Sequence, residues 1–182
     1  MPLGGNISSI ESRAARPQLD WLTLTPSAPP SQALRRYQRS RGSLLGRWRF
    51  ARAARMRTPL LGTLQAQIGE LRVGLCRIEM QAHRRVCSAD GAIDPMVISA
   101  LAQLAATMVI EVSVPEGLSW TMRGLTAERL RRVEAAVIAV ARLDKTDWAE
   151  TGLVGVPVTI SQVAAGEIAR AVVSFAVATR ID

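Results

Sequence analysis

Residues 94–111 read DPMVISALAQLAATMVIE, and this stretch decides how the rest of the chain must fold. Asp94 is a residue type that helix N-caps favour, and Pro95 suits the first helical position, where an N–H would have no helical partner. The segment predicts a helix from Asp94 to about Glu111 that is apolar on nearly every side. Because such a helix must be buried all round, we expect a sheet to wrap it.

The sequence on both sides of this helix has the pattern of strands. Residues 76–83 alternate between apolar and polar side chains, which is typical of a half-buried strand. Val73-Gly74 predicts a hairpin turn from a preceding strand at residues 65–72. Four strand-like runs follow the helix with no helical segment between them, which predicts an antiparallel meander: residues 120–131, 135–143, 153–160 and 168–179. The predicted fold class is therefore α+β.

Composition is that of an ordinary globular protein and excludes several kinds of site. The 182 residues are 48% hydrophobic and 21% charged, enough for one core without a disulfide or metal staple. Two cysteines and one histidine are too few for a disulfide scaffold, a four-ligand zinc site or a His-rich metal centre. We therefore expect no cofactor. Residues 1–9 lack the pattern of a signal peptide and the apolar run 96–110 is short for a membrane span, so we expect a cytoplasmic protein.

Positive charge is concentrated ahead of this domain. The net charge is +8, and residues 31–57 hold nine arginines and no acidic residue, so the remainder is close to neutral. Apolar residues recur in this segment near helical spacing. We divide the chain into a mobile leader (1–30), a basic helical arm (31–58) and a domain (59–182). The arm could bind an anionic partner such as lipid, nucleic acid or a phosphate-bearing ligand, or pack on the domain with its arginines in solvent.

Four segments around the predicted helix carry a resemblance to a known family: RVCSADGAID at 85–94, QLA at 103–105, PEGLSW at 115–120 and GLTAERL at 124–130. In this order they resemble the hotdog-fold acyl-CoA thioesterase-like superfamily, in particular a branch similar to the PaaI-type enzymes. The resemblance implies a hotdog fold, in which a curved antiparallel sheet wraps a long central helix. It also implies a homodimer whose sheets join edge to edge, with the ligand site between protomers at the helix N-terminus.

The chain departs from the family pattern where chemistry is expected. Ser88 and Ala89 stand at the family's Asn-His pair, Asp94 at its histidine before the helix, and Gln103 at its helix glutamate. A glutamine cannot accept a proton, so Gln103 can only orient water or substrate. The base would then be Asp94, and the helix N-terminus would polarise the thioester carbonyl. We expect Gln103 to face the same side of the helix as Asp94.

These catalytic assignments have structural alternatives, because Asp94 could act only as the N-cap and Gln103 could be a satisfied buried amide. The substrate is expected to contact residues near the start of the helix and one on its face: Ser88, Asp90, Gly91, Ile93 and Thr107. Asp90-Gly91 is also a common turn dipeptide. Cys87 lies in the same loop but would need a neighbouring base to act as a nucleophile, and His83 is expected to face solvent.

Three classes of function remain open from the sequence. The first is hydrolysis of acyl-CoA or acyl-carrier-protein thioesters at a degenerate site. The second is a non-hydrolytic protein that binds an acyl ligand or catalyses a proton-transfer step, such as dehydration, isomerisation or cyclisation, in a biosynthetic pathway. The third is an interaction module that acts through the basic arm.

Overall fold

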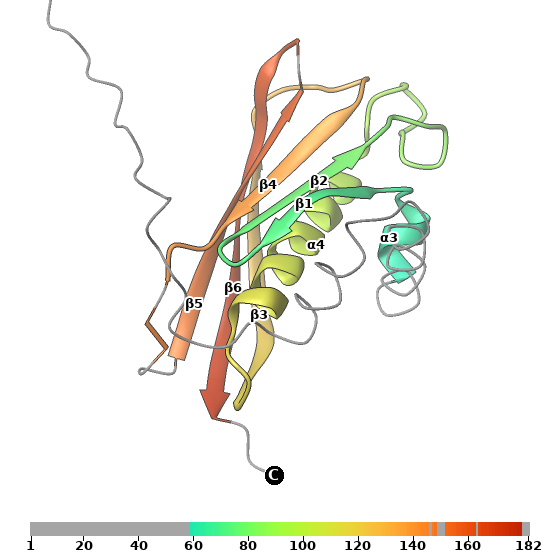
Figure 1. Cartoon of the computed structure of the whole chain (residues 1–182). Coiled ribbons are helices and arrows are strands. Elements are labelled where there is room, and N and C mark those ends of the chain that lie inside the picture. The colour runs from blue at the N-terminus through green and yellow to red at the C-terminus, as the bar shows by residue number, and fades with distance from the viewer. Residues whose placement is uncertain (1–58, 146, 149–151, 163, 180–182) are drawn as a thin grey trace, which may run out of the picture.

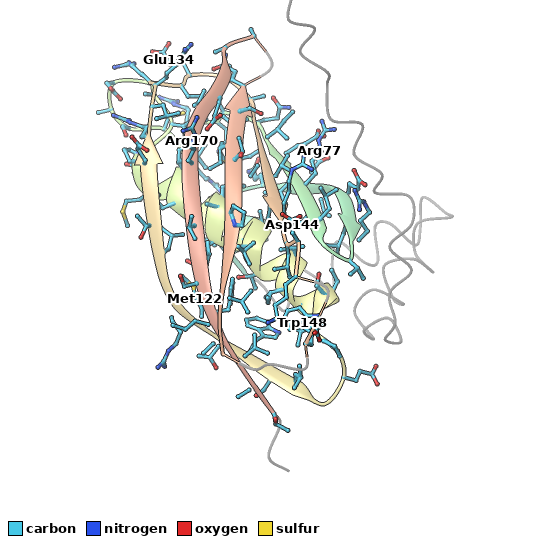
Figure 2. All side chains as sticks on the ribbon, turned by 90° about the vertical axis from the view of Figure 1, so that its left-hand side faces the viewer. Arg77, Met122, Glu134, Asp144, Trp148 and Arg170 are labelled. Atoms are coloured by element: carbon cyan, nitrogen blue, oxygen red, sulfur yellow. The ribbon has the colours of Figure 1, made fainter. Side chains whose placement is uncertain are left out.

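A computed structural model describes residues 59–145, 147–148, 152–162 and 164–179. A six-stranded antiparallel sheet curves around one long helix (Figure 1). In the view onto the sheet, the helix lies behind the strands (Figure 2). This confirms the predicted α+β class and the arrangement of a sheet around a central helix. The predicted leader (1–30) and basic arm (31–58) lie outside the described residues.

The described residues form eight elements: α3 (Pro59–Thr63), β1 (Gln67–Arg72), β2 (Leu75–Met80), α4 (Pro95–Ser113), β3 (Leu118–Arg129), β4 (Val137–Arg142), β5 (Gly152–Gln162) and β6 (Gly166–Thr179). The predicted helix and all six predicted strands are present within a few residues of their expected bounds. The short helix α3 has no counterpart in the sequence prediction, because five residues are too few to display a helical period.

The strand order β1-β2-β4-β5-β6-β3 corrects the predicted meander. The strand after the helix, β3, pairs with β6 at the far edge of the sheet, and β4 pairs with β2 instead. Buried side chains still face one another across the new pairs, as Ile78 and Ala139 do between β2 and β4. Alternation along a strand identifies its buried face but does not identify the neighbouring strand. The strand order could therefore not be predicted from this pattern.

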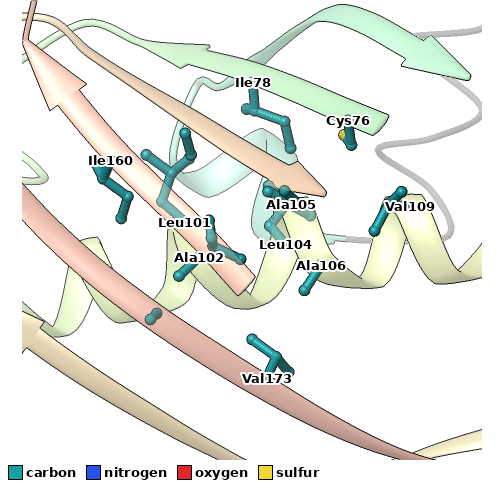
Figure 3. Packing of buried hydrophobic residues seen from close by; sticks show 14 of the residues in the cluster. Cys76, Ile78, Leu101, Ala102, Leu104, Ala105, Ala106, Val109, Ile160 and Val173 are labelled. Atoms are coloured by element: carbon teal, nitrogen blue, oxygen red, sulfur yellow. The ribbon is translucent and has the colours of Figure 1, made fainter. Parts of the chain in front are cut away.

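The helix α4 lies at the centre of the hydrophobic core (Figure 3). Leu101 and Leu104 are fully buried in one cluster with inward-facing residues of the sheet, among them Ile160 and Val173. Burying each of these leucines contributes about 2 kcal/mol. The small residues Ala102, Ala105 and Ala106 are buried as well, which allows the strands to approach the helix closely.

The sequence suggested that the apolar run 96–110 is short for a membrane span, and the length of α4 corrects this expectation. With 19 residues it is long and apolar enough to cross a membrane, by length and composition alone. However, half of its apolar window is buried inside the domain. Since the sheet of its own chain covers that side, we interpret α4 as the core helix of the domain.

Candidate active site

The first turn of α4 is closed by Asp94. The backbone of Asp94 is extended (φ −60°, ψ 135°), and its Oδ1 accepts the Met96 N–H at 2.7 Å. Its carbonyl accepts the N–H groups of Val97 at 3.0 Å and Ile98 at 3.2 Å. Pro95 carries no N–H. The donors of the first turn are thus engaged by Asp94 itself, which argues against the expectation that they polarise a substrate carbonyl.

The loop before α4 is a hydrogen-bonded unit that reaches the same carboxylate. The Ser88 hydroxyl donates to Asp94 Oδ2 at 3.2 Å, so both oxygens of Asp94 accept a hydrogen bond. Within the loop, Ser88 N–H donates to the Ala92 carbonyl at 2.8 Å and Gly91 N–H donates to the Ser88 carbonyl at 3.0 Å. The Ala92 N–H donates to Asp90 Oδ1 at 3.3 Å. Ser88, Asp90, Gly91 and Asp94 therefore lie together, and their contact with a ligand stays a prediction.

Ile93 belongs to the core, although the sequence suggested it as a ligand contact. Its side chain is 1% exposed. Its N–H donates to the Val133 carbonyl at 2.7 Å, which ties the loop to the segment between β3 and β4. The side chain of Ile93 therefore serves the core, and its contact with a ligand stays a prediction.

Gln103 lies on the one face of α4 that the sheet leaves uncovered. It is exposed, whereas its neighbours Ala102 and Leu104 are buried. Met96, two turns earlier on this face, is also exposed, and Thr107, one turn later, is half-buried. An exposed side chain is not a satisfied buried amide, which removes that alternative.

Asp94 and Gln103 do not share a site within one chain. Nine residues of α-helix correspond to about 13 Å of rise and to two and a half turns. Half a turn of rotation places Gln103 on the opposite side of the helix from the cap. The expectation that the two side chains face the same side is therefore wrong.

Arg132 joins the loop from the segment that follows β3. Its Nη1 donates to Asp90 Oδ2 at 2.7 Å, and its Nη2 donates to the Asp90 carbonyl at 2.6 Å. Its Nε donates to Glu134 Oε1 at 2.9 Å. The hydrogen bond to Glu134, followed by the negative charge of Asp90, raises the pKa of the Arg132 guanidinium. Glu134 lies at the end of the sheet remote from Trp148 (Figure 2). No local motif marks Arg132, because this contact depends on the strand order.

The histidine and the two cysteines are half-buried or buried among residues of the fold. His83 is half-buried with Nε2 3.3 Å from the Leu64 carbonyl, which corrects the expectation that it faces solvent. Cys87 is half-buried and forms an isolated β-bridge with Ile93. Cys76 is fully buried, and burial raises the pKa of its thiol. Within the described ranges, no group of three or more His, Cys, Asp or Glu residues could hold a metal ion.

Comparison with known protein families identifies the family of this chain. The family described as "Domain of unknown function (DUF4442)" matches residues 46–177, most of the chain. The chain belongs to this family. A comparison of the DUF4442 chain with curated proteins found no match.

Solved structures similar to this DUF4442 protein identify its fold. A structural-genomics crystal structure is 26% identical with a TM-score of 0.71, covering 81% of this chain and 98% of its own. A thioesterase from Haemophilus influenzae is 16% identical with a TM-score of 0.60, covering 67% and 84%. A protein of Pseudomonas aeruginosa described as a probable thioesterase is 13% identical with a TM-score of 0.66, covering 72% and 95%. These likenesses confirm the hotdog fold.

Proposed function

We propose that this protein acts on acyl thioesters and hydrolyses acyl-CoA or acyl-carrier-protein thioesters, with Gln103 in contact with the substrate. The observation that carries the proposal is the exposure of Gln103, a polar side chain on the face of an apolar helix that the sheet leaves uncovered. The exposed amide can bind a ligand, and it replaces the helix glutamate of the family that the sequence resembles. The thioesterases among the similar folds support the same class of substrate.

We propose that the site forms between two protomers. Asp94 and Gln103 of one chain are too far apart to contact one carbonyl group, whereas a second copy can bring its own Gln103 to the loop. Two features support such a pairing. The sheet ends at β3, whose outer edge has no partner strand in the described part of the chain, and open edges favour pairing. The face of α4 that the sheet leaves uncovered, with the exposed apolar side chain of Met96, also favours a partner.

In the proposed reaction, Asp94 of one protomer acts as the base, and Gln103 of the second copy acts as the orienting group. Asp94 would accept a proton from water while the water oxygen attacks the thioester carbonyl carbon. The C–S bond then breaks, and the proton passes from Asp94 to the thiolate that leaves. Gln103 would donate its amide N–H to the carbonyl oxygen and so favour the developing charge. The half-buried Ser88 hydroxyl keeps Asp94 oriented.

A specific observation favours a second candidate, the non-hydrolytic protein. Both carboxylate oxygens of Asp94 already accept hydrogen bonds, one from the helix backbone and one from Ser88. Those two donors occupy lone pairs with which a general base would contact an attacking water. In this role the protein would bind an acyl ligand or catalyse dehydration, isomerisation or cyclisation.

Release of free thiol from a panel of acyl-CoA thioesters distinguishes the two candidates. We expect turnover by the natural protein, a loss of about 100-fold in Asp94→Asn and a loss of about tenfold in Gln103→Ala. Gln81→Ala removes the same side chain from another exposed position and should be unaffected. Asp94→Asn keeps the cap, so loss of activity would not reflect loss of the helix start.

Each other outcome has a defined meaning. Full turnover in Asp94→Asn would remove Asp94 from the mechanism. An unchanged Gln103→Ala would remove the substrate contact on which the proposal depends. Absence of turnover, combined with thermal stabilisation by the same thioesters, would favour the non-hydrolytic candidate.

A further inference from the structure

We propose that Arg132 is a positioning residue of the candidate site, which holds residues 88–93 in the conformation that presents Ser88 and Asp94 to a ligand. This inference rests on the proposed function, because it assigns a role within the same site. Arg132 itself lies outside the group of residues that would contact the substrate.

The contacts of Arg132 fix Asp90 from one side. Two of its nitrogens donate to Asp90, one to the side chain and one to the backbone carbonyl, at 2.7 and 2.6 Å. The third donates to Glu134, which orients the guanidinium plane. On its other side Asp90 accepts the Ala92 N–H. The turn at Asp90 is therefore held through both its side chain and its backbone.

From Asp90 the hydrogen bonds continue to the carboxylate of the site. Ser88 N–H donates to the Ala92 carbonyl, and the Ser88 hydroxyl donates to Asp94. On the other side of the loop, Ile93 N–H donates to the carbonyl of Val133, the residue next to Arg132. The segment 132–134 thus holds the turn that precedes α4 at Asp90 and at Ile93.

The contact set requires an arginine. A guanidinium presents several donors in one plane, whereas a lysine ammonium is a point charge that cannot serve these three acceptors in the same geometry. The ion pairs of Arg132 are exposed, and exposed pairs contribute little to global stability. We therefore expect the loss of Arg132 to loosen the loop without unfolding the domain.

Hydrogen exchange of the full chain without ligand tests the first half of this inference. In Arg132→Gln, the Gly91 and Ala92 amides should exchange about tenfold faster or more, while the melting temperature changes little. Arg132→Lys should restore only part of the protection. The control Arg129→Gln removes the same charge from an exposed residue at the end of β3 and should leave the loop unchanged.

Steady-state kinetics with acyl-CoA tests the second half. After normalisation to the folded fraction, Arg132→Gln should lower kcat by about tenfold with a smaller change in KM, because a misplaced base affects the reaction more than binding. Because Arg132→Lys should restore part of the protection from exchange, its kcat should lie between those of the natural protein and Arg132→Gln. A purely structural role would lower activity only in proportion to the folded fraction.

The two readouts separate the possible failures. Unchanged exchange in Arg132→Gln, or an equal effect in Arg129→Gln, overturns the positioning role whatever the kinetics show. Faster exchange with unchanged kinetic constants overturns it as well, since the loop order would not matter to the reaction. If the natural protein neither hydrolyses nor binds thioesters, the proposed function fails together with the role of Arg132 in it. The exchange data then still decide whether Arg132 orders the loop.

Discussion

The two ends of α4 are held by different means. At the C-terminal end, the buried Ser113 Oγ accepts the Gly74 N–H at 2.9 Å, and the Gly74 carbonyl accepts the Leu143 N–H at 2.9 Å. At the N-terminal end, the corresponding contacts are made by the side chains of Ser88, Asp90 and Arg132, which are half-buried or exposed. One end is anchored through the buried Ser113 to the half-buried β1–β2 turn, and the other is fixed by polar groups that solvent can reach.

This difference indicates which end suits a ligand. Polar groups sealed in a core serve only each other, because a ligand cannot reach them without opening the fold. Polar groups at a half-exposed loop keep lone pairs and donors that a ligand can use. The comparison therefore supports the N-terminal end as the reactive one, and four measurements can contradict or sharpen it.

The largest difference is expected between the two thiols. Cys87 is half-buried in the N-terminal loop, whereas Cys76 is fully buried beside the C-terminal half of α4 (Figure 3). We expect an alkylating reagent to modify Cys87 more than about a thousandfold faster, since Cys76 reacts only after the fold opens. Mass spectrometry of the labelled native protein measures both rates. A Cys87→Ser variant should take up no label without denaturant, and rapid labelling of Cys76 would show that the C-terminal end opens readily.

The same burial gives a pH dependence of known sign. Because the pKa of Cys76 is raised in the folded state, only the unfolded chain releases this proton in mildly alkaline solution. The contribution of Cys76 to stability is therefore intact below the ordinary thiol pKa of about 8.5 and is lost progressively above it. The urea midpoint of Cys87→Ser should fall with rising pH in that range, and a further Cys76→Ala substitution should reduce this slope.

A smaller difference is expected between two glycines with left-handed backbones. Gly74 has φ 76° and a Cβ there would lie 3.0 Å from the Leu143 carbonyl oxygen, whereas Gly91 has φ 83° with nothing within 4 Å. Alanine pays the conformational cost at both positions, but only Gly74→Ala also collides with backbone. We expect losses of about 3 kcal/mol for Gly74→Ala and about 1 kcal/mol for Gly91→Ala, measured by urea unfolding. Equal losses would mean that the β1–β2 turn adjusts freely.

The smallest difference is expected between two serines. Ser113→Ala leaves the half-buried Gly74 N–H without its buried acceptor, which should cost about 1 kcal/mol. Ser88→Ala removes a 3.2 Å bond at a half-buried site, where water can take the place of the hydroxyl, and should cost about 0.5 kcal/mol. Chemical unfolding of both variants measures the two losses in the free energy of unfolding. A larger loss for Ser88→Ala would contradict the assignment of the structural anchor to the C-terminal end.

Local signals predicted most of the fold and part of the site. The Asp94-Pro95 pair located the start of α4 to the residue, and Val73-Gly74 located the first hairpin. These signals succeed because a cap or a turn depends on neighbouring residues only. The loop residues Ser88, Asp90 and Gly91 lie together for the same reason, and their contact with a substrate stays a prediction.

What the sequence could not predict depends on contacts distant along the chain. The neighbours of β3 and β4 follow from how the sheet closes around α4, and the pairing of Arg132 with Asp90 follows from that closure. The exposure of Gln103 could not be predicted either, because α4 is apolar on nearly every side. The sheet covers only part of this helix. A composition measured around a helix does not say which side its neighbours leave open.

The pairing of β3 with β6 also sets an order of events while the chain is being synthesised. Arg129 pairs with Ala169 and Leu118 with Thr179, so β3 leaves the ribosome well before the strand that it needs. Until β6 follows, β3 has no neighbour in the sheet and the apolar side of α4 lacks two of its covering strands. Strand pairs this distant in sequence form slowly and leave apolar surface open to aggregation in the meantime. The nascent domain therefore keeps apolar surface exposed for as long as its last strand is missing.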